Sequence, residues 1–161
     1  MEIYRDFREL LELFNARGVE YVIVGGYALA HHGAPRYTRD IDLYVRPTKT
    51  NSERVLAALD AFGFGQVGLK AEDFQTPDQI VQLGYPPVRV DLITSIAGVS
   101  WEEAAGGRSE GDYGGTPVPF LGRTELITNK KAAGRLQDLA DAERLQGPPP
   151  NQSVRRRRRS R

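Results

Sequence analysis

Apolar residues recur at helical spacing in several stretches of the chain. In residues 4–16 they stand at positions i, i+3, i+4 and i+7, so this stretch is predicted to form an amphipathic helix that packs on the core. Similar spacing predicts a helix over residues 53–62 and a last, longest helix over residues 124–145. The core-facing candidates of that last helix are Leu126, Ile127, Leu136, Leu139, Ala140 and Leu145.

Four charged residues are interspersed among these candidates: Lys130, Arg135, Asp138 and Asp141. Charged side chains are rarely fully buried. Considered one at a time, each is therefore expected on a solvated helix face that carries ion pairs.

Short apolar runs between the helices predict β-strands. Residues 21–24 are continuously apolar, as in a central strand covered on both faces. Further strands are predicted at residues 40–45, 79–83, 88–93 and 116–121. Pro117 and Pro119 favour an edge position for the last strand, because proline donates no ladder hydrogen bond. The glycine-rich residues 106–115 before it are expected to form a polar loop.

A glycine pair, Gly25-Gly26, stands between the first strand and a short predicted helix over residues 27–32. Backbone N–H groups without a neighbouring Cβ can approach a ligand, and the positive end of a helix favours an anion such as a triphosphate. A plain tight turn is the commoner outcome for such a pair, so both interpretations stay open. His31 and His32 diverge by about 100° and are interpreted as helix-end polar residues.

Asp40 and Asp42 begin the second strand and are separated by one residue. Residues i and i+2 of a strand point to the same face, so both carboxylates are expected on one side. Two close carboxylates repel each other unless a cation lies between them. Mg²⁺ prefers oxygen ligands and suits chemistry on phosphates, so the pair predicts a metal-dependent nucleotidyl-transfer site.

Asp91 is a lone carboxylate among apolar neighbours in the predicted strand 88–93. Aspartate is rarely buried unless it is paired or coordinates a metal. A salt bridge with Arg89 is one interpretation. The other is that Asp91 supplies the third carboxylate of the metal site, as a metal ligand or general base.

Composition sets wider bounds. The 161 residues suit a single domain, predicted over residues 1–146, followed by a disordered Pro/Arg-rich tail over residues 147–161. The tail contains six arginines and no acidic residue, whereas the whole chain has a net charge of +1. Residues 1–145 therefore carry a net charge of about −5. There is no cysteine, which excludes disulfides and thiolate metal sites. No apolar run is long enough to span a membrane, and the N-terminus lacks a signal-peptide profile, so a cytoplasmic location without membrane association is expected.

The order of these motifs resembles the nucleotidyltransferase superfamily, whose fold is polymerase-β-like. The resemblance rests on Gly25-Gly26, then Asp40-Ile-Asp42 on the next strand, then a later lone aspartate. The chain is most similar to small bacterial nucleotidyltransferases of the AbiEii-toxin type. They tend to show two further motifs, matched here by Arg36-Tyr-Thr38-Arg-Asp40-Ile-Asp42-Leu and by Lys130-Lys-Ala-Ala-Gly-Arg135-Leu-Gln-Asp138-Leu-Ala-Asp141. Leu136-Gln137 departs from a common Pro-Lys and removes a positive charge.

The resemblance implies an α+β fold with a mixed sheet flanked by helices. It also implies transfer of an NMP from an NTP to a hydroxyl, with release of pyrophosphate. Asp40, Asp42 and Asp91 would bind Mg²⁺, with Mn²⁺ as a second option, and Asp91 would help deprotonate the acceptor. The triphosphate would contact residues spread over the chain: Gly25, Gly26, Arg36, Thr38 and Lys130. For Arg36, pairing with a surface acid is the alternative.

The acceptor stays open at this point. The resemblance suggests RNA, particularly a tRNA 3′ end, or a protein, and it suggests an antitoxin partner. The arginine tail favours RNA and the acidic domain mildly disfavours it. A small-molecule acceptor and a catalytically inactive nucleotide-binding or antitoxin module are the two alternatives.

Overall fold

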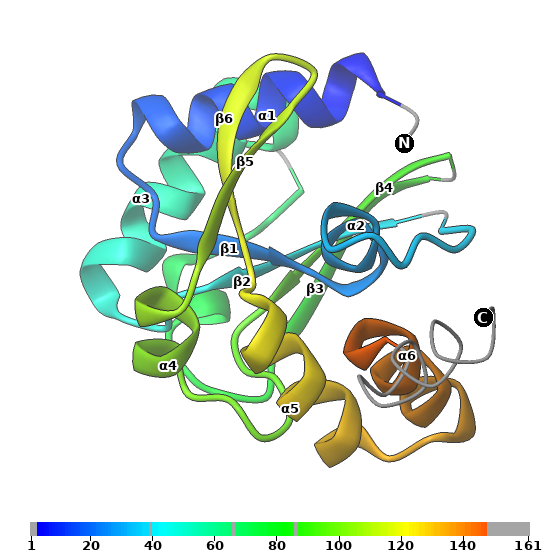
Figure 1. Ribbon diagram of the computed structural model, residues 1–161. Coiled ribbons are helices and arrows are strands. Elements are labelled where there is room, and N and C mark those ends of the chain that lie inside the picture. Colours follow the sequence, from blue (N-terminus) through cyan, green and yellow to red (C-terminus); the bar gives the residue numbers. More distant parts are fainter. Residues whose placement is uncertain (1–2, 39, 66, 86, 148–161) are drawn as a thin grey trace, which may run out of the picture.

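The computed structural model describes residues 3–38, 40–65, 67–85 and 87–147 (Figure 1). Apart from Gly147, the predicted tail lies outside these residues. The helices are α1 (Arg5–Ala16), α2 (Gly25–His31), α3 (Lys49–Leu59), α4 (Trp101–Gly106), α5 (Arg123–Ala133) and α6 (Leu136–Gln146), with short turns η1 (Asp60–Phe64) and η2 (Ala71–Phe74). The strands are β1 (Tyr21–Val24), β2 (Asp40–Val45), β3 (Ile80–Tyr85), β4 (Val88–Ile93), β5 (Ser109–Tyr113) and β6 (Thr116–Phe120).

The strands form one mixed sheet in the order β3-β4-β2-β1-β6-β5. β2 pairs antiparallel with β1 and parallel with β4, so the strands that carry the predicted aspartates are neighbours. In Figure 1, α1 lies at the opposite end of the molecule from the α5–α6 hairpin. The expected α+β class, with a mixed sheet flanked by helices, is confirmed.

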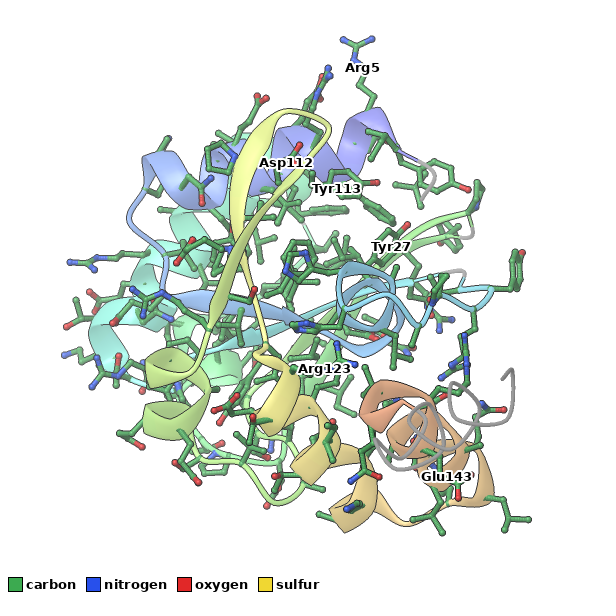
Figure 2. The ribbon with its side chains drawn as sticks, viewed as in Figure 1. Arg5, Tyr27, Asp112, Tyr113, Arg123 and Glu143 are labelled. Carbon is green, nitrogen blue, oxygen red and sulfur yellow. The ribbon has the colours of Figure 1, made fainter. Side chains whose placement is uncertain are left out.

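The core sits around the central strands and the helices that pack on them. Ile23, Leu43 and Leu92, from three adjacent strands, are fully buried. Between α2 and the β5–β6 hairpin, the rings of Tyr27 and Tyr113 meet edge-on with centroids 5.8 Å apart (Figure 2). This aromatic contact fixes α2, and with it the glycine pair at its start.

The chain over residues 106–120 forms a β-hairpin, and here two predictions are wrong. The expected loop contains strand β5, and β6 lies between β1 and β5 instead of at an edge. Gly114 and Gly115, at φ +59° and +92°, close the two-residue turn that a hairpin favours. The prolines fit between two strands because β6 pairs with β1 only at Ile23 and Phe120, where Leu121 N–H donates to Ile23 O.

The predicted helix 124–145 is two helices. Gly134 adopts the left-handed conformation (φ +72°) that ends α5. Asp138 accepts a hydrogen bond from Arg135 N–H and so caps the start of α6. α6 therefore folds back along α5, which leaves Leu136 88% and Leu139 44% exposed instead of in the core. The same fold-back buries Lys130, Asp138 and Asp141, so the solvated face expected for them is wrong.

Within the described residues, every helix is too short or too polar to cross a membrane.

Candidate active site

Three carboxylates lie on one face of the sheet. In the parallel pairing of β2 and β4, Asp40 is the partner of Arg89 and Asp42 is the partner of Asp91. Alternation along each strand places Asp40 and Asp42 on the same face, with Arg89 and Asp91 beside them. The parallel register therefore brings the Asp-x-Asp pair together with the lone aspartate of β4, Asp91, which lies 49 residues after Asp42 in the sequence.

Asp42 and Asp91 are electrostatically linked. Burial, the Asp91 charge and a hydrogen bond with Asp91 raise the pKa of Asp42 to about 7. Burial and the Asp40 charge raise the pKa of Asp91, while Arg89 and hydrogen bonds from Asp42 and Gln82 oppose that rise. A proton shared between the two carboxyl groups, with Asp42 as the donor, is the arrangement that relieves their repulsion.

Two polar residues complete the carboxylate cluster and were not assigned to the site from the sequence. Arg89 contacts Asp40 at 2.5 Å (Nη2 to Oδ2) and Asp91 at 3.7 Å (Nε to Oδ1). Gln82, the β3 partner of Asp91, hydrogen-bonds its carboxylate. The salt bridge between Arg89 and Asp91 is thus present, and the shorter contact to Asp40 is new. The sequence could not have assigned Gln82 to the site, because only the pairing of β3 with β4 places Gln82 beside Asp91.

The glycine pair is explained by close approach at the start of α2. A Cβ on Gly25 would lie 2.2 Å from Asp42 Oδ2, and one on Gly26 would lie 2.7 Å from the Thr38 Cβ. Gly25 also adopts φ +66°, which disfavours any other residue. No side chain caps this helix start, so its first backbone N–H groups lie beside the carboxylates without a side-chain acceptor from Val24. α2 begins at Gly25, two residues earlier than predicted.

A cavity of about 250 Å³ borders the start of α2. Three of the residues predicted to bind the nucleotide line it, namely Gly26, Arg36 and Thr38. Three tyrosines also line it: Tyr4, Tyr27 and Tyr37. The Thr38 hydroxyl is 3.2 Å from Asp40 N–H, from which it accepts a hydrogen bond, so it also fixes the first residue of β2.

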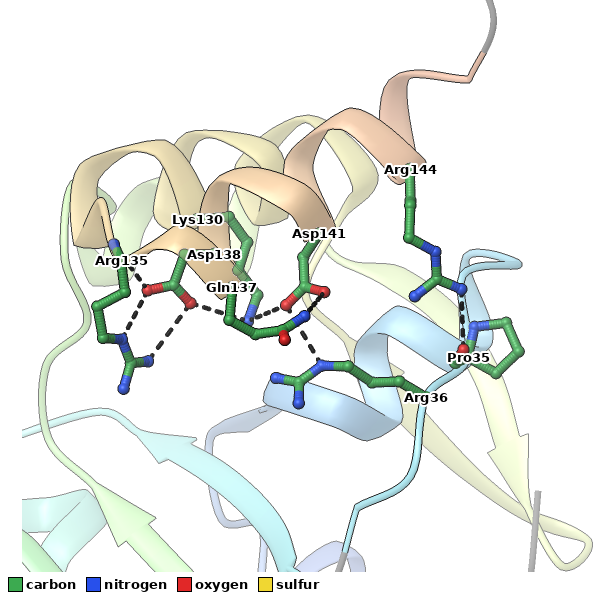
Figure 3. A network of polar contacts seen from close by, with 8 residues as sticks. All are labelled: Pro35, Arg36, Lys130, Arg135, Gln137, Asp138, Asp141 and Arg144. Carbon is green, nitrogen blue, oxygen red and sulfur yellow. Dashed lines mark hydrogen bonds and ion pairs between the residues drawn. The ribbon is translucent and has the colours of Figure 1, made fainter.

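A buried ion network holds the two predicted cations (Figure 3). Lys130 Nζ lies 3.2 Å from Asp141 and 3.5 Å from Asp138, and Arg36 Nε lies 3.3 Å from Asp141. Asp141 is fully buried, so the surface acid considered for Arg36 is instead a buried one. The positive charge of Lys130 also opposes the rise in the pKa of Asp42, as the smallest of the effects on that carboxyl group. Arg135, with a side chain 80% exposed, completes the network on Asp138 at 2.7 Å.

The two histidines have structural partners. The His31 ring stacks on Phe120 with centroids 4.1 Å apart, and its Nε2 lies 2.9 Å from the Ser109 hydroxyl. His32 Nε2 hydrogen-bonds Leu121 O at 2.7 Å. Both rings attach α2 to the β5–β6 hairpin and the residue that follows it.

The donor chemistry at the carboxylates fits a hard divalent cation. Asp40 Oδ1 and Asp91 Oδ1 are buried and have no hydrogen-bond partner within the part of the chain that the structure describes. Such oxygens are costly to bury unless a cation satisfies them. Within residues 3–38, 40–65, 67–85 and 87–147, however, no three acidic or histidine side chains converge closely enough to hold an ion as they stand.

Known proteins match this chain in both sequence and fold. Residues 11–117 match the family of the nucleotidyl transferase AbiEii toxin of type IV toxin–antitoxin systems. No curated protein matches the sequence. The structure of TM1012 from Thermotoga maritima, a candidate nucleotidyltransferase, shares 14% identity at a TM-score of 0.58, over 98% of this chain and 92% of that one.

Two further solved structures share the fold. The lincosamide antibiotic adenylyltransferase LnuA, bound to lincomycin, matches 91% of this chain and 99% of its own, at 15% identity and a TM-score of 0.51. The antibiotic-resistance factor ANT(2'')-Ia matches 87% of this chain and 80% of its own, at 17% identity and a TM-score of 0.52. The motifs, the fold and the family match agree: the chain belongs to the AbiEii family of nucleotidyl transferase toxins.

Proposed function

We propose that this protein transfers an NMP from an NTP to a hydroxyl acceptor in a reaction that depends on a divalent cation, Mg²⁺ or alternatively Mn²⁺. The observation that carries the proposal is the register of β2 and β4, which sets Asp40, Asp42 and Asp91 on one face beside the start of α2. Two buried carboxylate oxygens that lack a hydrogen-bond partner among the described residues support a cation at this place.

Each carboxylate has a role in the proposal. Asp40, Asp42 and Asp91 would hold the divalent cations, and Asp91 would also accept the proton of the acceptor hydroxyl. When bound, the cations would supply stabilisation of the negative charge on the oxygens of the displacement. The acceptor oxygen forms a bond to the α-phosphorus, and the bond to the departing pyrophosphate breaks.

The triphosphate side is assigned to the start of α2 and the cavity beside it. Backbone N–H groups of Gly25 and Gly26 donate to the β- and γ-phosphates, which is supported by the helix start that no side chain caps. The Thr38 hydroxyl and Arg36 line the same cavity. Lys130 is the proposed catalytic cation, supported by its electrostatic effect on Asp42.

For the acceptor, we propose an RNA, with a tRNA 3′ end as the first choice, or a protein, because the family is one of toxins that pair with antitoxins. An antitoxin partner follows from the same family membership. The second candidate acceptor is a small molecule. It is favoured by the shared fold of LnuA, which acts on a lincosamide antibiotic.

The experiment incubates the protein with each α-labelled NTP, Mg²⁺ and either total RNA, cell lysate or a panel of hydroxylated antibiotics. Label on one fraction, lost in Asp42→Ala and in EDTA, supports the proposal and identifies the acceptor class. Label incorporated equally by the Asp42→Ala variant would overturn the assignment of the site. Nucleotide binding with no transfer to any acceptor would favour the inactive-module alternative.

A further inference from the structure

Arg89 occupies the position of a cation within the carboxylate cluster. Its Nη2 is 2.5 Å from Asp40 Oδ2 and its Nε is 3.7 Å from Asp91 Oδ1, so one guanidinium spans both acids. The three side chains are only 33%, 17% and 14% exposed, for Arg89, Asp40 and Asp91 respectively. Ion pairs this sheltered from water are weakly screened.

This contact accounts for the incomplete convergence of the acids. Asp40 Oδ2 faces Arg89, while its other oxygen is buried without a partner. Arg89 Nε and Asp91 Oδ1 likewise lack a good hydrogen bond, because 3.7 Å is too long for one. Among the described residues, Arg89 is the only cation within ion-pair distance of Asp40 or Asp91.

We propose that Arg89 is a built-in competitor of the divalent cation: it neutralises Asp40 and Asp91 in the metal-free protein and must leave them before the cation binds. The inference rests on the proposed metal site. A guanidinium and a divalent cation repel each other, and Arg89 contacts both Asp40 Oδ2 and Asp91 Oδ1, so a cation binds these acids less tightly while Arg89 holds them. The apparent affinity for the cation is then the intrinsic affinity multiplied by the fraction of molecules in which Arg89 has left the acids.

Direct binding of Mn²⁺, followed by electron paramagnetic resonance at pH 8 without nucleotide, tests the proposal. We expect Arg89→Met to bind Mn²⁺ about tenfold more tightly than wild type. Arg46→Met is the matched control, since Arg46 follows β2, is 39% exposed and pairs at 3.1 Å with Glu20 away from the site. The control should bind Mn²⁺ as wild type does. Unchanged or weaker binding by Arg89→Met would overturn the proposal.

A second variant keeps the test decisive if Arg89→Met folds poorly. Arg89→Gln is neutral but keeps a hydrogen-bond donor for Asp40, and it should also bind Mn²⁺ more tightly than wild type. Asp42→Ala separates the two hypotheses. If wild type and Asp42→Ala bind Mn²⁺ equally, the metal site itself is wrong. If Asp42→Ala loses binding but neither Arg89 variant gains affinity, the metal site stands and the competitor role fails.

Discussion

Asp42 on β2 and Asp91 on β4 are register partners and share a hydrogen bond. The two strands are parallel neighbours, so the contact joins parts of the chain that are separated by α3, the turns η1 and η2, and β3. It brings the third carboxylate to the Asp-x-Asp pair and makes the site depend on the sheet as a whole.

Replacing Asp42 should separate activity from stability. Asp42→Ala is expected to abolish nucleotidyl transfer, while the free energy of unfolding without metal stays within about 1 kcal/mol of wild type, because the change removes carboxylate repulsion. Transfer of an α-labelled NMP and urea unfolding in EDTA measure the two quantities. Retained transfer would contradict the role of Asp42, and a loss of several kcal/mol would show a structural one.

The proton on Asp42 should make the metal-free protein less stable as the pH rises. The pKa of Asp42 is raised to about 7 in the folded state from 3.8, mainly by burial and then by Asp91. Between these values the folded state binds a proton that the unfolded state has lost, so stability falls from about pH 4 to pH 7. Unfolding in EDTA at pH 5 and pH 8 measures the effect. Relative to wild type, Asp42→Ala should have its higher free energy of unfolding at pH 8, and this advantage should shrink or reverse at pH 5. A difference in free energy of unfolding that does not change with pH would contradict the pKa shift.

Gly25 should tolerate no side chain. In Gly25→Ala the new Cβ would lie 2.2 Å from Asp42 Oδ2 at a backbone φ of +66°, so it should displace Asp42 and destabilise the fold by roughly 2–3 kcal/mol. Gly33→Ala is the control, because Gly33 also has a positive φ (+85°) but no atom within 4 Å of its Cβ position. It should lose only about 1 kcal/mol and keep transfer activity. Equal losses in thermal unfolding and in activity would show that the contact with Asp42 is unimportant.

Lys130 should be necessary for stability as well as for activity. Among the described residues, Lys130→Met leaves the fully buried Asp141 with Arg36 as its one ion-pair partner, and it should cost about 3–5 kcal/mol. Adding Asp141→Leu should restore part of that loss, since no buried charge is then left at that position. Arg46→Met, which breaks a half-exposed pair with Glu20, should cost less than about 1 kcal/mol. Urea unfolding of wild type, these three variants and Asp141→Leu alone measures this; strictly additive losses would show that Lys130 and Asp141 are not coupled.

Local pattern alone was enough to predict much of this protein. Alternation along residues 40–45 places Asp40 and Asp42 on one face in any β-strand, whatever the rest of the fold. The apolar run at residues 21–24 and the glycine pair that follows it likewise predicted a buried strand and a helix start. These features depend on neighbours within a few residues, where sequence spacing and geometry are tightly linked.

Only the tertiary structure decided which distant charges meet. Gln82 joins the site through strand pairing, and nothing in its own sequence context distinguishes it from a surface residue. The sequence predicted Arg89 as a partner of Asp91, but its shorter contact with Asp40 follows from the pairing of β2 with β4. Lys130, Asp138 and Asp141 occur in a polar pattern typical of a solvated helix, yet Gly134 breaks that helix and the fold-back buries them. Their burial depends on the packing of two consecutive helices against each other, which helical periodicity does not encode.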